Sequence, residues 1–204
     1  MTKFIFDLDG TLTKEETLPL IAKAFGVEEE IAELTERTVM GQIPFVDSFI
    51  HRVSLLGKLP VDKIGDLLAH AGLHEGLVDF IQKHKEQCCI ATGNLSCWAA
   101  KLIERIGCTA YCSEGEVVNN QVVGITAILK KEEIVARYQE AGWRVVFIGD
   151  GDNDVEAMRL ADIAVAAGLT HKPSPGVVSV ADEMIMEERA LCSRLEHFLQ
   201  DPGK

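Results

Sequence analysis

Two aspartates stand one residue apart near the start of the chain, directly after a short apolar run. Residues 4–6 are apolar, Asp7 and Asp9 follow, and Gly10 comes next. Side chains two apart on an extended chain face the same side, so the two carboxylates converge unless the turn separates them. Neighbouring carboxylates raise each other's pKa unless a cation neutralises them. The pair is therefore a candidate for acid chemistry beside a bound cation.

Three further polar segments lie beside predicted strands and helices. The segment Thr92–Asn94 enters a predicted helix, whose first backbone amides can bind an anion. Lys130 and Lys131 stand at the start of another predicted helix, where the helix dipole mildly disfavours cations. An acid-rich segment, 150–154, follows an apolar run. Because ligands bind at the carboxyl ends of parallel strands, we expect these segments and the aspartate pair to form one site.

The candidate ligands in these segments are all oxygen atoms, which favours a hard cation such as Mg²⁺. A calcium-binding loop is the rival interpretation, since Asp150, Asp152 and Asp154 match its first three ligand positions. That template requires glycine and glutamate where this chain has Val155 and Ala161. We therefore expect Mg²⁺ rather than a calcium loop.

A carboxylate nucleophile, a second acid, a hydroxyl, a lysine and a metal together suit phosphoryl transfer. The lysine and the metal neutralise the phosphate oxygens while the nucleophile attacks in line. A signalling receiver domain also combines an acceptor aspartate with threonine and lysine, but it is shorter and lacks an acid two residues after the acceptor. A dehalogenase reaction would leave Asp9 and the metal-binding acids without a role. The residues thus favour a metal-dependent phosphoryl-transfer enzyme.

Apolar periodicity predicts an α/β fold. Four stretches between the first strand and residue 72 carry apolar residues at three- and four-residue spacing, as in a small helix bundle. Strands and helices then alternate, which predicts a parallel sheet with helices on both faces. We expect residues 1–13 and 73–204 to form a catalytic core, and residues 14–72 to form a four-helix-bundle cap inserted after the first strand.

Individual elements follow from the same pattern. A turn at Asn119-Asn120 between two valine pairs predicts a β-hairpin over residues 116–124. The other expected strands cover residues 3–8, 88–91, 144–149, 162–167 and about 182–186. The expected helices after the cap cover residues 76–86, 96–106 and 131–141, with a short helix after the acid-rich segment and a closing helix.

Composition narrows the class of protein. The 204 residues include 32 acidic and 20 basic ones, and the formal net charge of −12 argues against nucleic acid or an anionic membrane as partner. No apolar run approaches the about 18 residues of a membrane span, and only three apolar residues precede Asp7, so we expect no signal peptide. Six cysteines without a C-x-x-C pair favour reduced thiols in a cytoplasmic protein. The sequence leaves the oligomeric state open.

The segments DLDGT, ATGN, Lys131 and GDGDND resemble the four motifs of the haloacid dehalogenase (HAD) superfamily, in the same order. The resemblance covers nearly the whole chain and is closest to phosphoserine phosphatases. Their pattern D-x-D-[GS]-T-x-x-x-x-E-T matches DLDGTLTKEET, and HRVSLLGKLP resembles a segment of their cap. The resemblance implies a Rossmann-like core and a Mg²⁺-dependent phosphomonoesterase that hydrolyses phosphoserine, or a similar small phosphorylated amino acid, in serine biosynthesis. The alternative is a phosphatase or phosphotransferase of the superfamily that acts on another small phosphorylated metabolite.

The resemblance also implies roles for individual residues. Asp7 would form an aspartyl-phosphate, and Asp9 would protonate the leaving group and then deprotonate the attacking water. Thr92 and Lys131 would hold the phosphate, with Lys130 as the alternative lysine. The metal would be held by Asp7, the backbone carbonyl of Asp9, and Asp150, with Asp154 behind the metal and the lysine.

For the substrate, the resemblance places Glu16 at an ammonium group and Arg52 at a carboxylate. Each has a plainer interpretation, Glu16 as an acid at a helix start and Arg52 as a surface arginine. The second motif departs from the family's Ser-Gly-Gly, because Asn94 adds a side chain beside the phosphate or the substrate. The other expected substrate contacts are Gly93, Asn153, and the cap residues Phe45 and Val39.

Overall fold

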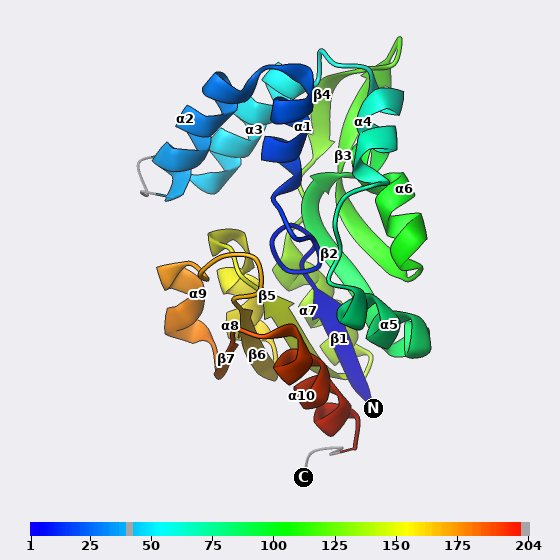
Figure 1. Ribbon diagram of the computed structural model, residues 1–204. Coiled ribbons are helices and arrows are strands. Elements are labelled where there is room, and N and C mark those ends of the chain that lie inside the picture. Colours follow the sequence, from blue (N-terminus) through cyan, green and yellow to red (C-terminus); the bar gives the residue numbers. More distant parts are fainter. Residues whose placement is uncertain (40–42, 201–204) are drawn as a thin grey trace.

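The computed structural model describes residues 1–39 and 43–200, and within them seven strands form a single sheet in the order β4-β3-β2-β1-β5-β6-β7 (Figure 1). Neighbouring strands are parallel except for the antiparallel pair β3 and β4. The predicted parallel α/β sheet is therefore confirmed. The strands are β1 (Thr2–Phe6), β2 (Cys88–Leu95), β3 (Thr109–Val118), β4 (Gln121–Ala127), β5 (Arg144–Gly149), β6 (Ile163–Ala167) and β7 (Glu183–Ile185).

Four helices separate β1 from the rest of the sheet, as the periodicity of the sequence predicts. They are α1 (Thr17–Phe25), α2 (Glu28–Val39), α3 (Phe45–Leu56) and α4 (Val61–Leu68). The remaining helices are α5 (Glu75–Lys83), α6 (Ser96–Ile106), α7 (Lys131–Glu140), α8 (Val155–Leu160), α9 (Pro175–Val180) and α10 (Glu188–Gln200), with short 3₁₀ turns η1 (Lys85–Gln87) and η2 (Asp152–Asp154).

The two faces of the sheet are covered by different helices, because successive side chains of a strand point to opposite faces. On β1, Phe4 and Phe6 belong to a core cluster that includes residues of α5, α6 and α10. Ile5, between them, belongs to a second cluster with residues of α7, α8 and α9. The strand is fully buried on both sides, as expected for the centre of a parallel sheet. Helices therefore cover both faces.

Helices α1, α2 and α3 gather at the end of the molecule toward which the β3–β4 hairpin projects (Figure 1). Asn119 and Asn120 at its turn have φ values of 49° and 66°, the left-handed conformation of a tight hairpin turn. The carbonyl of Asn120 accepts the Val61 N–H at 2.8 Å, and α3 packs against β4. The predicted hairpin is confirmed, and it supports the helices that follow β1.

Some element boundaries differ from the sequence-based expectation. Strand β2 continues to Leu95 instead of ending at residue 91, because its last residues still pair with β3. The first half of β3, from Thr109 to Ser113, is not predicted by the sequence, since Thr-Ala-Tyr-Cys-Ser shows neither an apolar run nor a regular alternation of apolar and polar residues. Strand β1 ends at Phe6, two residues earlier than expected, so Asp7 already belongs to the loop. Across residues 1–39 and 43–200, every helix is too short or too polar to cross a bilayer.

Candidate active site

Lys131 places its amino group between two buried carboxylates. Its Nζ atom lies 2.6 Å from Asp7 Oδ1 and 2.6 Å from Asp154 Oδ1. Helix α7 begins at Lys131, whereas Lys130 precedes the helix, is exposed, and forms an ion pair with Glu133 at 3.3 Å. Of the two adjacent lysines, the structure brings Lys131 to the acids.

Asp154 organises the loop after β5. Its Oδ2 atom accepts the backbone N–H groups of Asp150 and Gly151, both at 3.0 Å, while its Oδ1 accepts from Lys131. Both carboxylate oxygens of Asp154 therefore already have protein partners. Asp154 therefore links Lys131 to the backbone of the loop after β5.

Asp7, Asp150 and Asp154 each offer a carboxylate oxygen, and these oxygens lie within 4.8 Å of one another. Burial, followed by the charge of Asp154, raises the pKa of Asp150 to about 7. The same two causes raise the pKa of Asp7 well above its usual value, although Lys131 opposes them. Crowded, buried carboxylates of this kind are stabilised by a cation. An all-oxygen donor set suits Mg²⁺, so the residues present fit the expected ion.

The side chain of Asp9 is held by threonines of α1 and β2. Its Oδ1 accepts the backbone N–H of Thr17 at 3.1 Å and the hydroxyl of the same residue, and its Oδ2 accepts from the Thr92 hydroxyl at 3.2 Å. Burial, and next the charge of Glu16, raise the pKa of Asp9. Thr17 is a site residue that sequence reasoning missed, although it is the final threonine of the matched first motif. The Asp9 carboxyl group is thus held at the start of α1, with an increased tendency to carry a proton.

Thr92 and Asn94 connect the end of β2 to the same group. The Thr92 hydroxyl accepts the Asn94 N–H at 3.0 Å, and the Asn94 side-chain amide donates to the Thr17 hydroxyl at 2.7 Å. Asn94 is buried. The side chain that distinguishes this motif from Ser-Gly-Gly therefore bonds to α1, where it helps to position Thr17 and through it Asp9.

A cavity of about 590 Å³ opens over these groups. Thr92, Lys131 and Asp154 are buried beside it and do not line it. The side chains of Phe45 and Val39 lie outside the part of the chain that the structure describes. The expected site residues that line the cavity are Asp7, Asp9, Glu16, Arg52, Gly93, Asn94, Asp150 and Asn153.

Arg52 is a buried residue of α3, only 7% exposed, so its interpretation as a surface arginine is wrong. Its Nε atom donates to the Ser48 carbonyl at 3.4 Å. Burial lowers the pKa of Arg52, while the charges of Glu16 and Asp9 oppose that shift. A guanidinium group and carboxylates therefore influence each other across the cavity.

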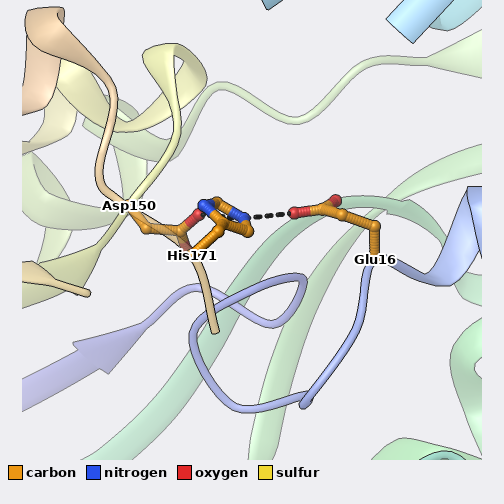
Figure 2. Close-up of side chains that lie close together, drawn as sticks. All are labelled: Glu16, Asp150 and His171. Atoms are coloured by element: carbon orange, nitrogen blue, oxygen red, sulfur yellow. Dashed lines mark hydrogen bonds and ion pairs between the residues drawn. The ribbon is translucent and has the colours of Figure 1, made fainter. Parts of the chain in front are cut away.

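His171 completes the cavity wall, and sequence reasoning missed it. Its Nε2 lies 2.8 Å from Glu16 Oε1 and 3.3 Å from Asp150 Oδ2 (Figure 2). The hydrogen bond to Glu16 is the largest cause that raises the pKa of His171 to about 9, with the charge of Asp150 acting in the same direction. A single histidine in a Pro/Gly-rich loop carries no motif, so its position followed only from the fold.

Gly10 allows these three groups to converge. Its φ of +79° is a left-handed conformation that favours glycine. A Cβ atom at this position would lie 2.7 Å from Asp150 Oδ2, 2.7 Å from His171 Nε2 and 2.9 Å from Glu16 Oε1. The glycine therefore clears the space in which the three side chains meet.

Comparisons with known proteins found similar sequences and a similar fold. Residues 2–162 match the family model described as "haloacid dehalogenase-like hydrolase". The chain is 31% identical over 197 residues to a "Phosphoserine phosphatase" of Archaeoglobus fulgidus, an alignment that covers 90% of this chain but only 56% of the relative. It is 27% identical to a "Phosphoserine phosphatase" of Halobacterium salinarum, over 94% of this chain and 95% of the relative. The solved structure "Phospho-Aspartyl Intermediate Analogue of Phosphoserine phosphatase" aligns with a TM-score of 0.79 and 26% identity, covering 98% of this chain and 99% of the other.

Proposed function

The chain belongs to the haloacid dehalogenase-like hydrolase family, and from that premise we propose that it is a Mg²⁺-dependent phosphomonoesterase acting on phosphoserine or a closely similar small phosphorylated amino acid. The observation that carries the proposal is the buried contact of Lys131 with Asp7. That contact sets a carboxylate and a permanent cation beside a cavity that Glu16 and Arg52 also line. The names of the relatives support phosphoserine as the substrate.

Asp7 is the proposed nucleophile. One of its carboxylate oxygens forms a bond to phosphorus while the bond from phosphorus to the leaving oxygen breaks, which yields an aspartyl-phosphate. Lys131 fixes the orientation of Asp7 and neutralises charge on the transferring group. Mg²⁺, when bound by Asp7, Asp150 and the backbone carbonyl of Asp9, supplies further positive charge at the phosphate oxygens.

Asp9 is the proposed proton shuttle. Its raised pKa favours the protonated form that the departing alkoxide requires. After that transfer, the Asp9 carboxylate accepts a proton from the water that attacks phosphorus, and phosphate leaves as Asp7 is regenerated. Thr17 and Thr92 hold both carboxylate oxygens, so the group stays aimed at one position.

The leaving group is recognised from the helical segment. Arg52 lies on α3, and Glu16 directly precedes α1. Their opposite charges suit the carboxylate and the ammonium group of an amino acid. We propose that residues 14–72 act as a cap over a core of residues 1–13 and 73–204, so that binding the substrate also excludes water.

The experiment is a phosphate-release screen over small phosphomonoesters with and without Mg²⁺. Selective turnover of L-phosphoserine that is lost in Arg52→Ala, while hydrolysis of p-nitrophenyl phosphate persists, would support the proposal. Arg159→Ala, at an exposed arginine of α8, is the matched control and should behave as the wild type. Equal turnover of sugar phosphates would contradict the proposed preference for a phosphorylated amino acid. An acyl-phosphate that is still trapped in Asp7→Asn would show that the nucleophile is wrong.

A further inference from the structure

The carboxylate of Glu16 is already engaged by a side chain of the protein itself. We propose that His171 is a specificity-determining residue: it competes with the ammonium group of the substrate for Glu16 and thereby weakens the preference for phosphorylated amino acids over phosphorylated hydroxy acids. This inference rests on the proposed function, in which Glu16 receives that ammonium group. It adds a residue outside the four motifs to the determinants of substrate choice.

The geometry defines the competition. The His171 Nε2–H group donates to Glu16 Oε1 at 2.8 Å, and Figure 2 shows the two side chains pointing toward each other across the site. Glu16 and His171 both line the cavity. A substrate ammonium that binds Glu16 must therefore either share Oε1 with the imidazole or displace it. A substrate without the ammonium leaves the pair intact.

The loop that carries His171 is attached to its surroundings by the preceding residue. The Thr170 hydroxyl donates to the Thr13 carbonyl at 2.7 Å, and His74 Nε2 lies 3.1 Å from the same hydroxyl. Thr13 belongs to the loop after β1, and His74 immediately precedes α5. These contacts hold the histidine opposite Glu16.

Positively charged side chains on the cavity wall also disfavour the binding of an ammonium group. Arg52 and Lys172 line the cavity together with His171. Asp7, Asp9 and Asp150 are committed to the reacting phosphate, the proton and the metal in the proposed mechanism. Glu16 is the acid that the proposed function assigns to the substrate's ammonium, and it is the acid to which His171 hydrogen-bonds. The contact between His171 and Glu16 does not weaken the binding of a leaving group that carries only a carboxylate. It does weaken the binding of a leaving group that carries an ammonium.

The test compares two substrates that differ only in the ammonium group: L-phosphoserine and its des-amino analogue, 3-phosphonooxypropanoate. The ratio of their kcat/KM values is measured at saturating Mg²⁺ for the wild type, His171→Ala and His171→Gln. Both compounds carry the same phosphate and carboxylate, so an effect of His171 on the metal through Asp150 cancels in the ratio. His70→Ala is the control, because its exposed ring bonds to the Asp66 carbonyl and does not line the cavity.

We expect the ratio to rise in favour of phosphoserine by about two- to fivefold in His171→Ala, the size of effect for one partly exposed side-chain hydrogen bond. The side chains of His171 and Glu16 are 42% and 39% exposed, which keeps the effect within that range. His171→Gln, which retains an N–H donor, should lie between the wild type and alanine, and His70→Ala should match the wild type. In a Glu16→Gln background, His171→Ala should no longer change the ratio.

Binding provides a second readout that needs no turnover. In the Asp7→Asn background, calorimetry should show that His171→Ala lowers the Kd for phosphoserine but leaves the Kd for the des-amino analogue unchanged. An unchanged or lowered ratio in His171→Ala, in an enzyme that hydrolyses both compounds, would overturn this inference and leave the proposed function standing. A wild-type chain that hydrolyses neither compound would instead overturn the proposed function, and this inference with it.

Discussion

Lys131 and Asp7 are in direct contact although 124 positions separate them in the chain, with Nζ 2.6 Å from Oδ1. Their side chains are only 2% and 5% exposed. Burial disfavours the charge of Lys131, but the carboxylates of Asp154 and Asp7 outweigh it and raise the lysine's pKa above its usual value. The proposed nucleophile therefore always has a cation beside it.

Replacing Lys131 by methionine should lower kcat by about 10²–10³-fold, because a preorganised charge opposite the transferring phosphate is lost. It should also destabilise the fold by about 3–5 kcal/mol, since two buried carboxylates lose their shared partner. Phosphate release and urea unfolding measure the two effects. Lys130→Met, at the exposed neighbour, should stay within about 0.5 kcal/mol of the wild type. If Lys130→Met lowered kcat and stability more than Lys131→Met, Lys131 would not be the lysine that acts at the phosphate.

Asp9→Asn should separate the two chemical steps. With phosphoserine, kcat should fall by about 10²–10⁴-fold, because the alkoxide leaving group requires a proton. With p-nitrophenyl phosphate, whose leaving group needs no proton, the first step should survive and the second should slow. Stopped-flow measurement should then show a burst of nitrophenol close to one equivalent per enzyme. Asp152→Asn, at an exposed acid of the cavity wall, is the control. If Asp9→Asn slowed the hydrolysis of both substrates equally and gave no burst, Asp9 would not be the proton shuttle.

Added Mg²⁺ should raise the melting temperature of the wild type, because an ion that binds only the folded chain stabilises it by about 2.7 kcal/mol at 100 times its Kd. Asp150→Asn should remove most of this gain. Asp152→Asn should retain it, since Asp152 is exposed and lies outside the two carboxylate-containing clusters found among the described residues. Thermal melts and calorimetric titration check both variants. A gain that survives in Asp150→Asn would place the metal elsewhere.

The stability of the metal-free protein should depend on pH through Asp150. Its pKa rises from 3.8 to about 7 on folding, so the folded chain binds the proton more tightly than the unfolded chain. The free energy of unfolding contributed by this group is therefore greatest below about pH 4 and is lost as the pH rises through about 7. Asp150→Asn should show a smaller decline over that interval, as should the wild type in saturating Mg²⁺. If the free energy of unfolding fell equally with pH in all three samples, Asp150 would not be the group responsible for the pH dependence.

Much of this site could be predicted from sequence because its parts are short, local patterns. Asp7 and Asp9 stand in one motif, and Asp150 and Asp154 in another, each directly after a continuous apolar run. Parallel strands place their carboxyl ends at one edge, so the meeting of the motifs followed from the fold class alone. The hairpin at Asn119-Asn120 was predictable for the same reason, since its turn chemistry is local.

Long-range contacts were not predictable in this way, because they depend on strand order and on the direction of each side chain. Lys130 and Lys131 are neighbours with the same chemistry; the resemblance favours Lys131, and the start of α7 at that residue is what brings it to Asp7. His171 meets Glu16 across 155 positions, with no motif to mark it. The sequence by itself therefore determined which groups are the candidates for the chemistry and in what order they occur. The tertiary structure alone brought Thr17 and His171 beside them, because a packed fold allows each side chain only the space that its distant neighbours leave.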